Sequence, residues 1–430
     1  MSRPRLARPA GLAGLAALAL LTTACGGSSA VPSQAAAPPP APRPSMLTSL
    51  SAGHGAAWAV VEVGGSRAEH NNFWQLLVRP AAGQAWRLAT PPGVADNGGL
   101  VATGPGSTGS TAGPGSTGNG SGAAGSGAST APGLVAGFVP SQDLTFSPLA
   151  VSRDGGQHWS PGLLPSGLAA TASALAAGPG GRLLALTRTG VQLSGSDGAG
   201  WSPLISTKAL AASPAGRSCG LTGLTAVAFG SGGAPLLAGA CRRPGVTGIF
   251  FQSGGQWRLA GLKPPAGFAG RPVTVVQLTS TAPGKLTALL ADGPAPAGTG
   301  ASAGTGPGTA RELAAAWLGD GQPWTTSAPL PLGGAQLVST AAGSDGSAGV
   351  ILTGGRAAVI RPAGATTAAA WAPLPALPAA AADLVLGPGH QVSVLTAGRT
   401  TVTTWLLGKT GTAWSPGQKL TIPVPFGSSG

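Results

Sequence analysis

Few side chains in this sequence could carry out covalent or acid–base chemistry. The 430 residues include eleven aspartates and glutamates, four histidines, three cysteines and no tyrosine. Two carboxylates can hydrolyse a glycoside when they face each other across the scissile bond. The glutamates are Glu62, Glu69 and Glu312, and no spacing in the sequence places two carboxylates across one pocket. We therefore expect no catalytic residue, with a glycoside hydrolase as the alternative.

Metal, phosphate and serine chemistry have even less support. The histidines His54, His70, His158 and His390 lack the spacing of metal ligands, and no cysteine pair resembles a zinc knuckle. Two G-x-S-x-G matches, at 216–220 and 300–304, lack the strand–elbow–helix context that a serine nucleophile needs. There is no phosphate-binding loop. We expect neither a metal nor a cofactor.

One octet, S-R-D-G-G-Q-H-W at 152–159, has a sharply defined spacing. Ser152 and Asp154 can hydrogen-bond turn amides, Gly156 can take a positive φ, and Trp159 can fold beneath the hairpin as an apolar plug. The octet therefore predicts a turn that closes two strands.

This octet matches the Asp-box, and the chain in this respect resembles the sialidase-like (BNR-repeat) β-propellers. The resemblance implies that the hairpin lies on the periphery of a blade, away from any catalytic centre. Sialidases use an arginine cluster, an acidic residue and a tyrosine nucleophile assisted by a glutamate, and this chain has no tyrosine. The resemblance thus implies an architecture and not sialidase activity.

Weaker copies of the octet recur along the chain. Each keeps a tryptophan followed by a short stretch with proline nearby, and six of the seven have glycine three residues before the tryptophan. Proline cannot donate to a ladder, so these stretches are expected to be outermost edge strands. The repeat tryptophans are Trp86, Trp159, Trp201, Trp257, Trp324, Trp371 and Trp414.

Two or three β-like runs separated by glycine turns precede each repeat tryptophan. Four strands in each of seven units predict an all-β, seven-bladed β-propeller over residues 46–430, with six or eight blades as alternatives. The predicted blades begin near residues 46, 93, 168, 218, 271, 335 and 379. The ring closes either with a last blade completed by 418–425 or with 46–51 joining that blade.

Two low-complexity segments, 104–132 and 293–310, are predicted to be disordered insertions. Each is expected to lie between two strands of a single blade. The opening SLSAGHGAAWAV at 49–60 is also similar to the photosystem-assembly-factor-like propellers. Trp58, Trp74, Trp317 and Trp405 stand outside the repeat position. Their sequence contexts favour packing between blades over stacking on a sugar.

The amino terminus has the features of an export signal. In residues 1–24, three arginines precede an apolar run at 11–21 that is too short to span a bilayer. The ending LTTAC resembles a bacterial lipobox with Cys25 as the acylated residue, and an ordinary signal-peptidase site is the alternative. Residues 25–45, rich in proline, alanine and serine, would then tether the domain to the outer face of the cytoplasmic membrane.

The two other cysteines, Cys219 and Cys241, are predicted to form a disulfide. They lie near the open end of one hairpin, formed by the runs 221–229 and 235–241, and an exported protein favours pairing. Two separate buried thiols are the alternative.

The formal net charge is +13. Apart from Arg242–Arg243 the basic residues are spread singly, unlike a nucleic-acid surface, and suggest a mild attraction to anionic lipid or wall polymer. The sequence thus predicts a lipid-anchored, non-enzymatic propeller that binds an extracytoplasmic protein or glycan.

Overall fold

The protein is nearly all β-structure. The computed structural model describes residues 45–51, 57–64, 72–80, 83–89, 99–104, 133–138, 149–152, 154, 156–159, 172–195, 200–282, 284–293, 310–319, 321–362 and 369–423. Within these residues no helix is long and apolar enough to cross a membrane. The predicted signal at 1–24, Cys25 and almost all of the tether lie outside the described residues.

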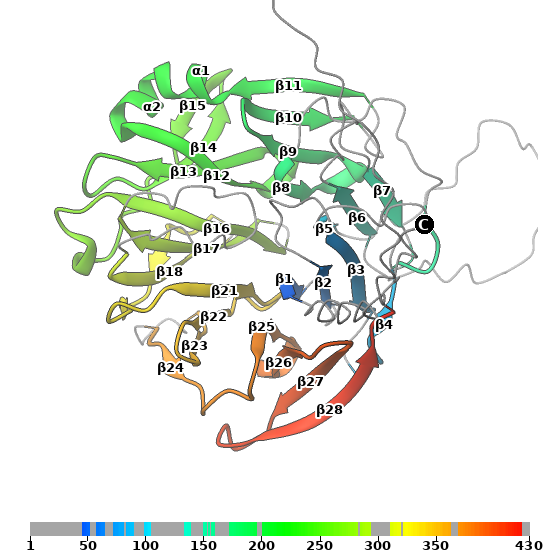
Figure 1. Cartoon of the computed structure of the whole chain (residues 1–430). Coiled ribbons are helices and arrows are strands. Elements are labelled where there is room, and N and C mark those ends of the chain that lie inside the picture. Colours follow the sequence, from blue (N-terminus) through cyan, green and yellow to red (C-terminus); the bar gives the residue numbers. More distant parts are fainter. Residues whose placement is uncertain are drawn as a thin grey trace, which may run out of the picture. The chain divides into compact units, whose positions relative to one another are not determined.

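The strands form antiparallel meanders in which each strand pairs with the next along the chain (Figure 1). The first two sheets consist of β1 (Ser45–Ser51), β2 (Ala57–Gly64), β3 (Asn72–Arg79) and β4 (Arg87–Leu88), and of β5 (Gly99–Gly104), β6 (Gly133–Phe138) and β7 (Leu149–Ser152). The third consists of β8 (Ala172–Ala177), β9 (Leu183–Thr187), β10 (Gly190–Ser194) and β11 (Trp201–Ser206).

Two further meanders are joined into one nine-stranded sheet. They contain β12 (Leu221–Phe229), β13 (Pro235–Cys241), β14 (Gly248–Ser253) and β15 (Gln256–Leu259), and β16 (Val273–Ala282), β17 (Lys285–Asp292), β18 (Glu312–Leu318), β19 (Thr325–Thr326) and β20 (Leu330–Pro331). The link is a short ladder between β13 and β16, where Ala240 pairs with Thr274 and Cys241 with Val273.

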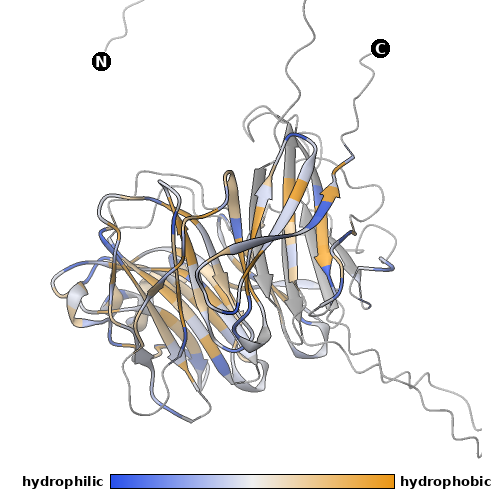
Figure 2. Cartoon of the chain, turned by 90° about the horizontal axis from the view of Figure 1, so that it is seen from below, coloured by the Kyte–Doolittle hydropathy of each residue, from blue (hydrophilic) through white to orange (hydrophobic). Residues whose placement is uncertain are grey.

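The last two sheets repeat the four-stranded pattern. They consist of β21 (Leu337–Ala342), β22 (Ala348–Leu352), β23 (Arg356–Ile360) and β24 (Ala372–Pro373), and of β25 (Ala381–Leu386), β26 (Val392–Ala397), β27 (Thr401–Leu407) and β28 (Trp414–Thr421). Buried apolar side chains of neighbouring sheets pack against one another. Figure 2 shows hydrophobic residues along the strands and hydrophilic ones in many connections.

The first strands of neighbouring meanders lie against one another, in the order β5, β8, β12, β16, β21 and β25, and β25 also lies against β1. Most of these strands contain a register shift, as at Ala172/Ala174, Val275/Gln277 and Ala381/Asp383. Such bulges bend a strand and increase its twist. Successive meanders packed through their first strands are the arrangement of a β-propeller.

The first and last sheets meet at a seam. Val385, Leu395 and Val402 pack with Leu77 and with Trp86, which is 5% exposed. The side chain of Gln418 accepts a hydrogen bond from the Trp86 amide at 2.6 Å and donates one to its carbonyl at 2.8 Å. The last sheet has its own four strands and β1 pairs with β2, so the 46–51 strand does not join the last sheet. Side-chain packing and the two Gln418 hydrogen bonds make the seam.

Two short helices add to the β-structure. α1 (Thr207–Ala212) and α2 (Pro214–Cys219) connect β11 to β12, and neither was predicted from the sequence. Ser206 and Ser213 cap them by accepting bonds from the amides of Ala209 and Gly216. These caps, the proline that opens α2 and Gly220 after its end are ordinary helix signals.

The insertion at 104–132 starts and ends on neighbouring strands. β5 and β6 pair up to Gly104 opposite Gly133, and residues 105–132 lie outside the described residues, as do residues 294–309 of the second insertion. Because the hairpin ends are already adjacent, replacing 105–132 by a short Gly-Ser turn should change the free energy of unfolding by no more than about 2 kcal/mol. Chemical denaturation of the shortened chain would measure this, and a much larger loss would show that the segment packs on the core.

Candidate functional site

The turn at 152–159 is held by a dense set of local hydrogen bonds. The Ser152 hydroxyl donates to Asp154 Oδ1 at 2.8 Å and accepts from the Gly156 amide at 2.7 Å. The same Asp154 oxygen accepts from the amides of Gln157 and His158, both at 2.9 Å. Gly156 has a φ of 83°, a conformation that glycine adopts without strain. Each of the polar residues singled out in the sequence thus bonds to the turn itself.

His158 faces Asp154 at the surface of this turn. Its Nδ1 lies 2.5 Å from Asp154 Oδ2, and its side chain is 89% exposed. Burial raises the pKa of Asp154, but hydrogen bonds from His158, Ser152 and Gln157 outweigh it and hold the pKa at about 2. The ionised carboxylate is therefore a turn-stabilising group.

Replacing Asp154 by asparagine should change how stability depends on pH. The folded-state pKa of about 2 lies below the ordinary 3.8, so the ionised carboxylate stabilises the fold above about pH 4. That stabilisation is lost as the pH falls through 2. After solvent screening we expect a loss of about 1 kcal/mol in the wild type over this range, which Asp154→Asn lacks. Denaturation at a series of pH values measures it, and superimposable pH profiles would contradict it.

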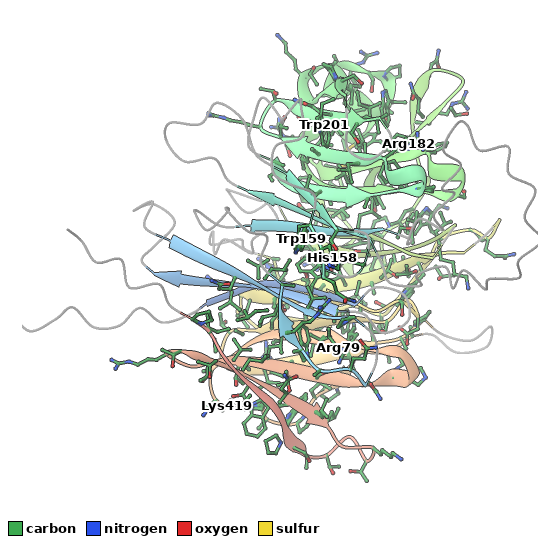
Figure 3. The ribbon with its side chains drawn as sticks, turned by 90° about the vertical axis from the view of Figure 1, so that its right-hand side faces the viewer. Arg79, His158, Trp159, Arg182, Trp201 and Lys419 are labelled. Carbon is green, nitrogen blue, oxygen red and sulfur yellow. A yellow bond between two sulfur atoms is a disulfide. The ribbon has the colours of Figure 1, made fainter. Side chains whose placement is uncertain are left out.

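The repeat tryptophans lie at the outermost strands. Trp201 and Trp414 are the first residues of β11 and β28, and Trp257 is the second residue of β15. Three other repeat tryptophans come directly before their outer strand. Those others are Trp86 before β4, Trp324 before β19 and Trp371 before β24. Trp159 is the last residue of the 152–159 turn and is half-buried, so it is a less complete plug than expected. Figure 3 labels Trp159 and Trp201 among their neighbouring side chains.

The other tryptophans are placed in or beside the core where their side chains are described. Trp58 is 4% exposed and Trp317 is 8% exposed, and the Trp317 indole donates to the Gly346 carbonyl at 2.6 Å. The Trp405 indole donates to the Thr396 hydroxyl at 3.2 Å. The side chain of Trp74 lies outside the described residues.

The predicted disulfide between Cys219 and Cys241 is confirmed. Its Cα atoms are 5.1 Å apart, and both residues are almost fully buried. The bond ties the end of α2 to the end of β13, and the amides of Arg242 and Arg243 donate to the carbonyls of Gly220 and Cys219 beside it.

The described carboxylates outside the 152–159 turn are also bound by the fold. Asp292 is 1% exposed, is paired with Arg271 and accepts from the amides of Arg311 and Glu312. Glu312 lies 3.3 Å from the same arginine.

Two more carboxylates hold turns and strands in place. Asp345 accepts from the amide and hydroxyl of Ser347. Asp383 is fully buried and accepts from the hydroxyl of Ser339, on the neighbouring first strand, and from the amide of Leu384. Within the described part of the chain, no group of three or more His, Cys, Asp or Glu is arranged to hold a metal.

Sequence reasoning missed Arg79. This residue, labelled in Figure 3, ends β3 and is 6% exposed. Its guanidinium lies over the Trp86 ring, 5.5 Å from the ring centroid. Burial lowers its pKa from the ordinary value. Its Nε and Nη2 donate to no described atom. In the sequence Arg79 stands between a valine and a proline, and this local context does not indicate that the arginine is buried.

Comparison with known proteins gives likenesses in structure only. No family model matches, and no curated protein matches. A GH74 xyloglucanase from Xanthomonas campestris is similar at 16% identity with a TM-score of 0.49, over 85% of this chain and 52% of that one. YCF48 from Cyanidioschyzon merolae is similar at 12% identity, with a TM-score of 0.39, over 64% and 82% of the chains.

A third structure is PorZ, a surface component of the type-IX secretion system of Porphyromonas gingivalis. It is 12% identical with a TM-score of 0.43, over 89% of this chain and 39% of PorZ. Likenesses at these identities and TM-scores say nothing about what this chain binds.

Proposed function

We propose that this protein is an exported, lipid-anchored β-propeller that acts as a non-enzymatic binding or scaffold module outside the cytoplasmic membrane. The proposal includes seven blades, formed by the seven meanders that begin at β1, β5, β8, β12, β16, β21 and β25. The ladder between β13 and β16 then joins two neighbouring blades of one ring. The contact of Trp86 with Gln418 supports closure between the first and last blades.

The proposal that this protein is not an enzyme rests on the hydrogen bonds of the described carboxylates. Asp154, Asp292, Asp345 and Asp383 each accept hydrogen bonds from backbone amides in a turn or at a strand end, and Glu312 pairs with Arg271. A glycosidase needs one carboxyl group free to donate a proton and another facing the anomeric carbon. Carboxylates committed to backbone amides are poorly suited to either role.

A propeller of this kind offers a rigid platform with exposed turns at both ends of its sheets. The described turns are short and tied by local bonds, as in the amide of Gly178 bonded to the carbonyl of Arg182 and that of Gly387 to Gln391. Pre-formed turns lose little conformational entropy when they bind a partner. The partner we propose is an extracytoplasmic protein or glycan.

Chemical cross-linking in intact cells, followed by isolation of the full-length protein, tests the binding role. We expect a defined cross-linked complex in the membrane fraction. In parallel, the purified protein should release no new reducing ends from wall or surface glycans. Glycan cleavage that disappears in a Glu312→Gln or Asp345→Asn variant with unchanged melting temperature would establish the hydrolase alternative instead.

A further inference from the structure

We propose that one end of the sheets is a cationic surface that lies on the anionic lipid of the membrane to which the chain is tethered. This proposal rests on the lipid-anchored function above and adds an orientation to it. We name this end the connection face. It carries the turns between second and third strands and the links from one meander to the next.

The strand order fixes which connections belong to the connection face. In an antiparallel meander, alternate turns lie at opposite ends of the sheet. Bonds between the two kinds of connection agree with this: the amide of Thr207, in the link after β11, donates to the carbonyl of Thr189, in the β9–β10 turn. Likewise the amide of Ile422, after β28, donates to the carbonyl of Thr400 in the β26–β27 turn.

Basic side chains gather on the connection face from β8 onward, although they are scattered in the sequence. Each is exposed and stands in a turn between second and third strands, at its edge, or in a link between meanders. They are Arg188, Lys208, Arg217, Arg242, Arg243, Lys263, Arg311, Arg356 and Arg399. Only the topology brings them to one end of the sheets.

From β8 onward, acidic side chains do not offset this charge. Between residues 172 and 423 the acidic residues of the connection face are Asp292 and Glu312, and both are paired with Arg271. Asp292 is also buried. The undescribed stretch of this face in that range, 294–309, contains no charged residue.

The opposite end of the same sheets has a more balanced charge. Within residues 172–423 its exposed cations, among the described residues, are Lys285, Arg361 and Lys409, and it also carries the carboxylate of Asp345. Among the described residues the connection face thus has nine exposed cations and the opposite end three. The larger surplus of positive charge lies at the connection face, and such a surplus draws a protein to an anionic surface.

The point at which the tether joins the domain favours a membrane as the partner of the connection face. Ser45, the first residue of β1, pairs with Glu62 near the end of β2, so β1 begins at the connection face. Residues 26–44, which lead from Cys25 to this point, span at most about 60 Å in an extended state. The chain that leads from the proposed anchor therefore enters the domain at the end that carries the cations. A soluble polyanion would account for the charge but not for this coincidence.

Binding of the acyl-free chain to lipid vesicles tests the proposal separately from lipidation. The protein would be the mature chain from residue 25 with Cys25→Ser, so no acyl group contributes. We expect it to sediment with equimolar phosphatidylglycerol and phosphatidylcholine vesicles, not with phosphatidylcholine alone, and to be released as the ionic strength rises.

Two matched triple variants locate the surface. Arg188→Gln, Lys208→Gln and Arg243→Gln together should lower the partition coefficient about 100-fold, since each basic residue near the lipid contributes about fivefold. Lys285→Gln, Arg361→Gln and Lys409→Gln remove the same charge from the opposite end and should change it much less.

Equal losses in the two triple variants, or no binding by the parent chain, would overturn the proposal. Binding to soluble polyphosphate with the same dependence on the connection face, but none to the vesicles, would also overturn it and identify a polyanion as the partner. Lack of acylation at Cys25 in cells would contradict the lipid anchor and leave these vesicle results unchanged.

Discussion

Replacing Cys219 and Cys241 together by alanine is expected to lower the free energy of unfolding by about 3 kcal/mol. The disulfide closes a loop with a sequence separation of 22 residues, and the chain-entropy model assigns about this value to such a loop. The bond also joins α2 to β13 inside a cluster that contains Leu210 and Phe250. The helices and the β12–β15 meander should therefore lose the most stability.

Denaturation of the double variant beside the wild type, with and without a reductant, measures this effect. The reductant should destabilise the wild type by a similar amount and leave the variant unchanged. Alkylation of both cysteines in the native, unreduced protein, or a change below about 1 kcal/mol in the double variant, would contradict the structural role of this bond.

Replacing Trp86 by alanine should cost about 3–5 kcal/mol, the usual range for removing a buried tryptophan. Trp86 is the most buried repeat tryptophan, and it packs with residues of both the first and the last sheet. It also lies beneath Arg79. Loss of the ring would open a cavity at the seam and leave the Arg79 guanidinium without its aromatic contact.

Trp201→Ala is the matched control, because Trp201 occupies the same repeat position but is only half-buried. We expect a smaller loss of stability for this control, and hydrogen exchange in the first and last sheets should rise in the Trp86 variant alone. A similar cost for both variants, with no change in exchange at β25–β28, would show that the seam does not hold the domain together.

The sequence predicted the strands well because glycine turns and apolar runs are local signals. The expected runs at 221–229 and 235–241 coincide with β12 and β13, and this register also placed the two cysteines close enough to pair. The helices α1 and α2 were missed although Ser206, Ser213 and Pro214 are good helix signals. Each helix is only six residues long, so a helical period of apolar residues does not appear in the sequence.

Other features depend on contacts between distant parts of the chain. The burial of Arg79 follows from the meeting of the first and last sheets, which no local pattern reveals. The gathering of cations such as Arg188, Arg243 and Arg399 follows from the alternation of turns between the two ends of each sheet. In the sequence these residues are far apart and resemble a general solubilising charge.

The most direct test of the lipid-anchored function is the identity of the mature amino terminus. We expect mass spectrometry of protein extracted from the membrane fraction to show a chain that begins at Cys25 and carries diacylglycerol on its thiol. Cys25→Ser should then be released from membranes or incorrectly processed. A mature chain that begins elsewhere, without an acyl group, and whose membrane association is unchanged by Cys25→Ser, would contradict the account.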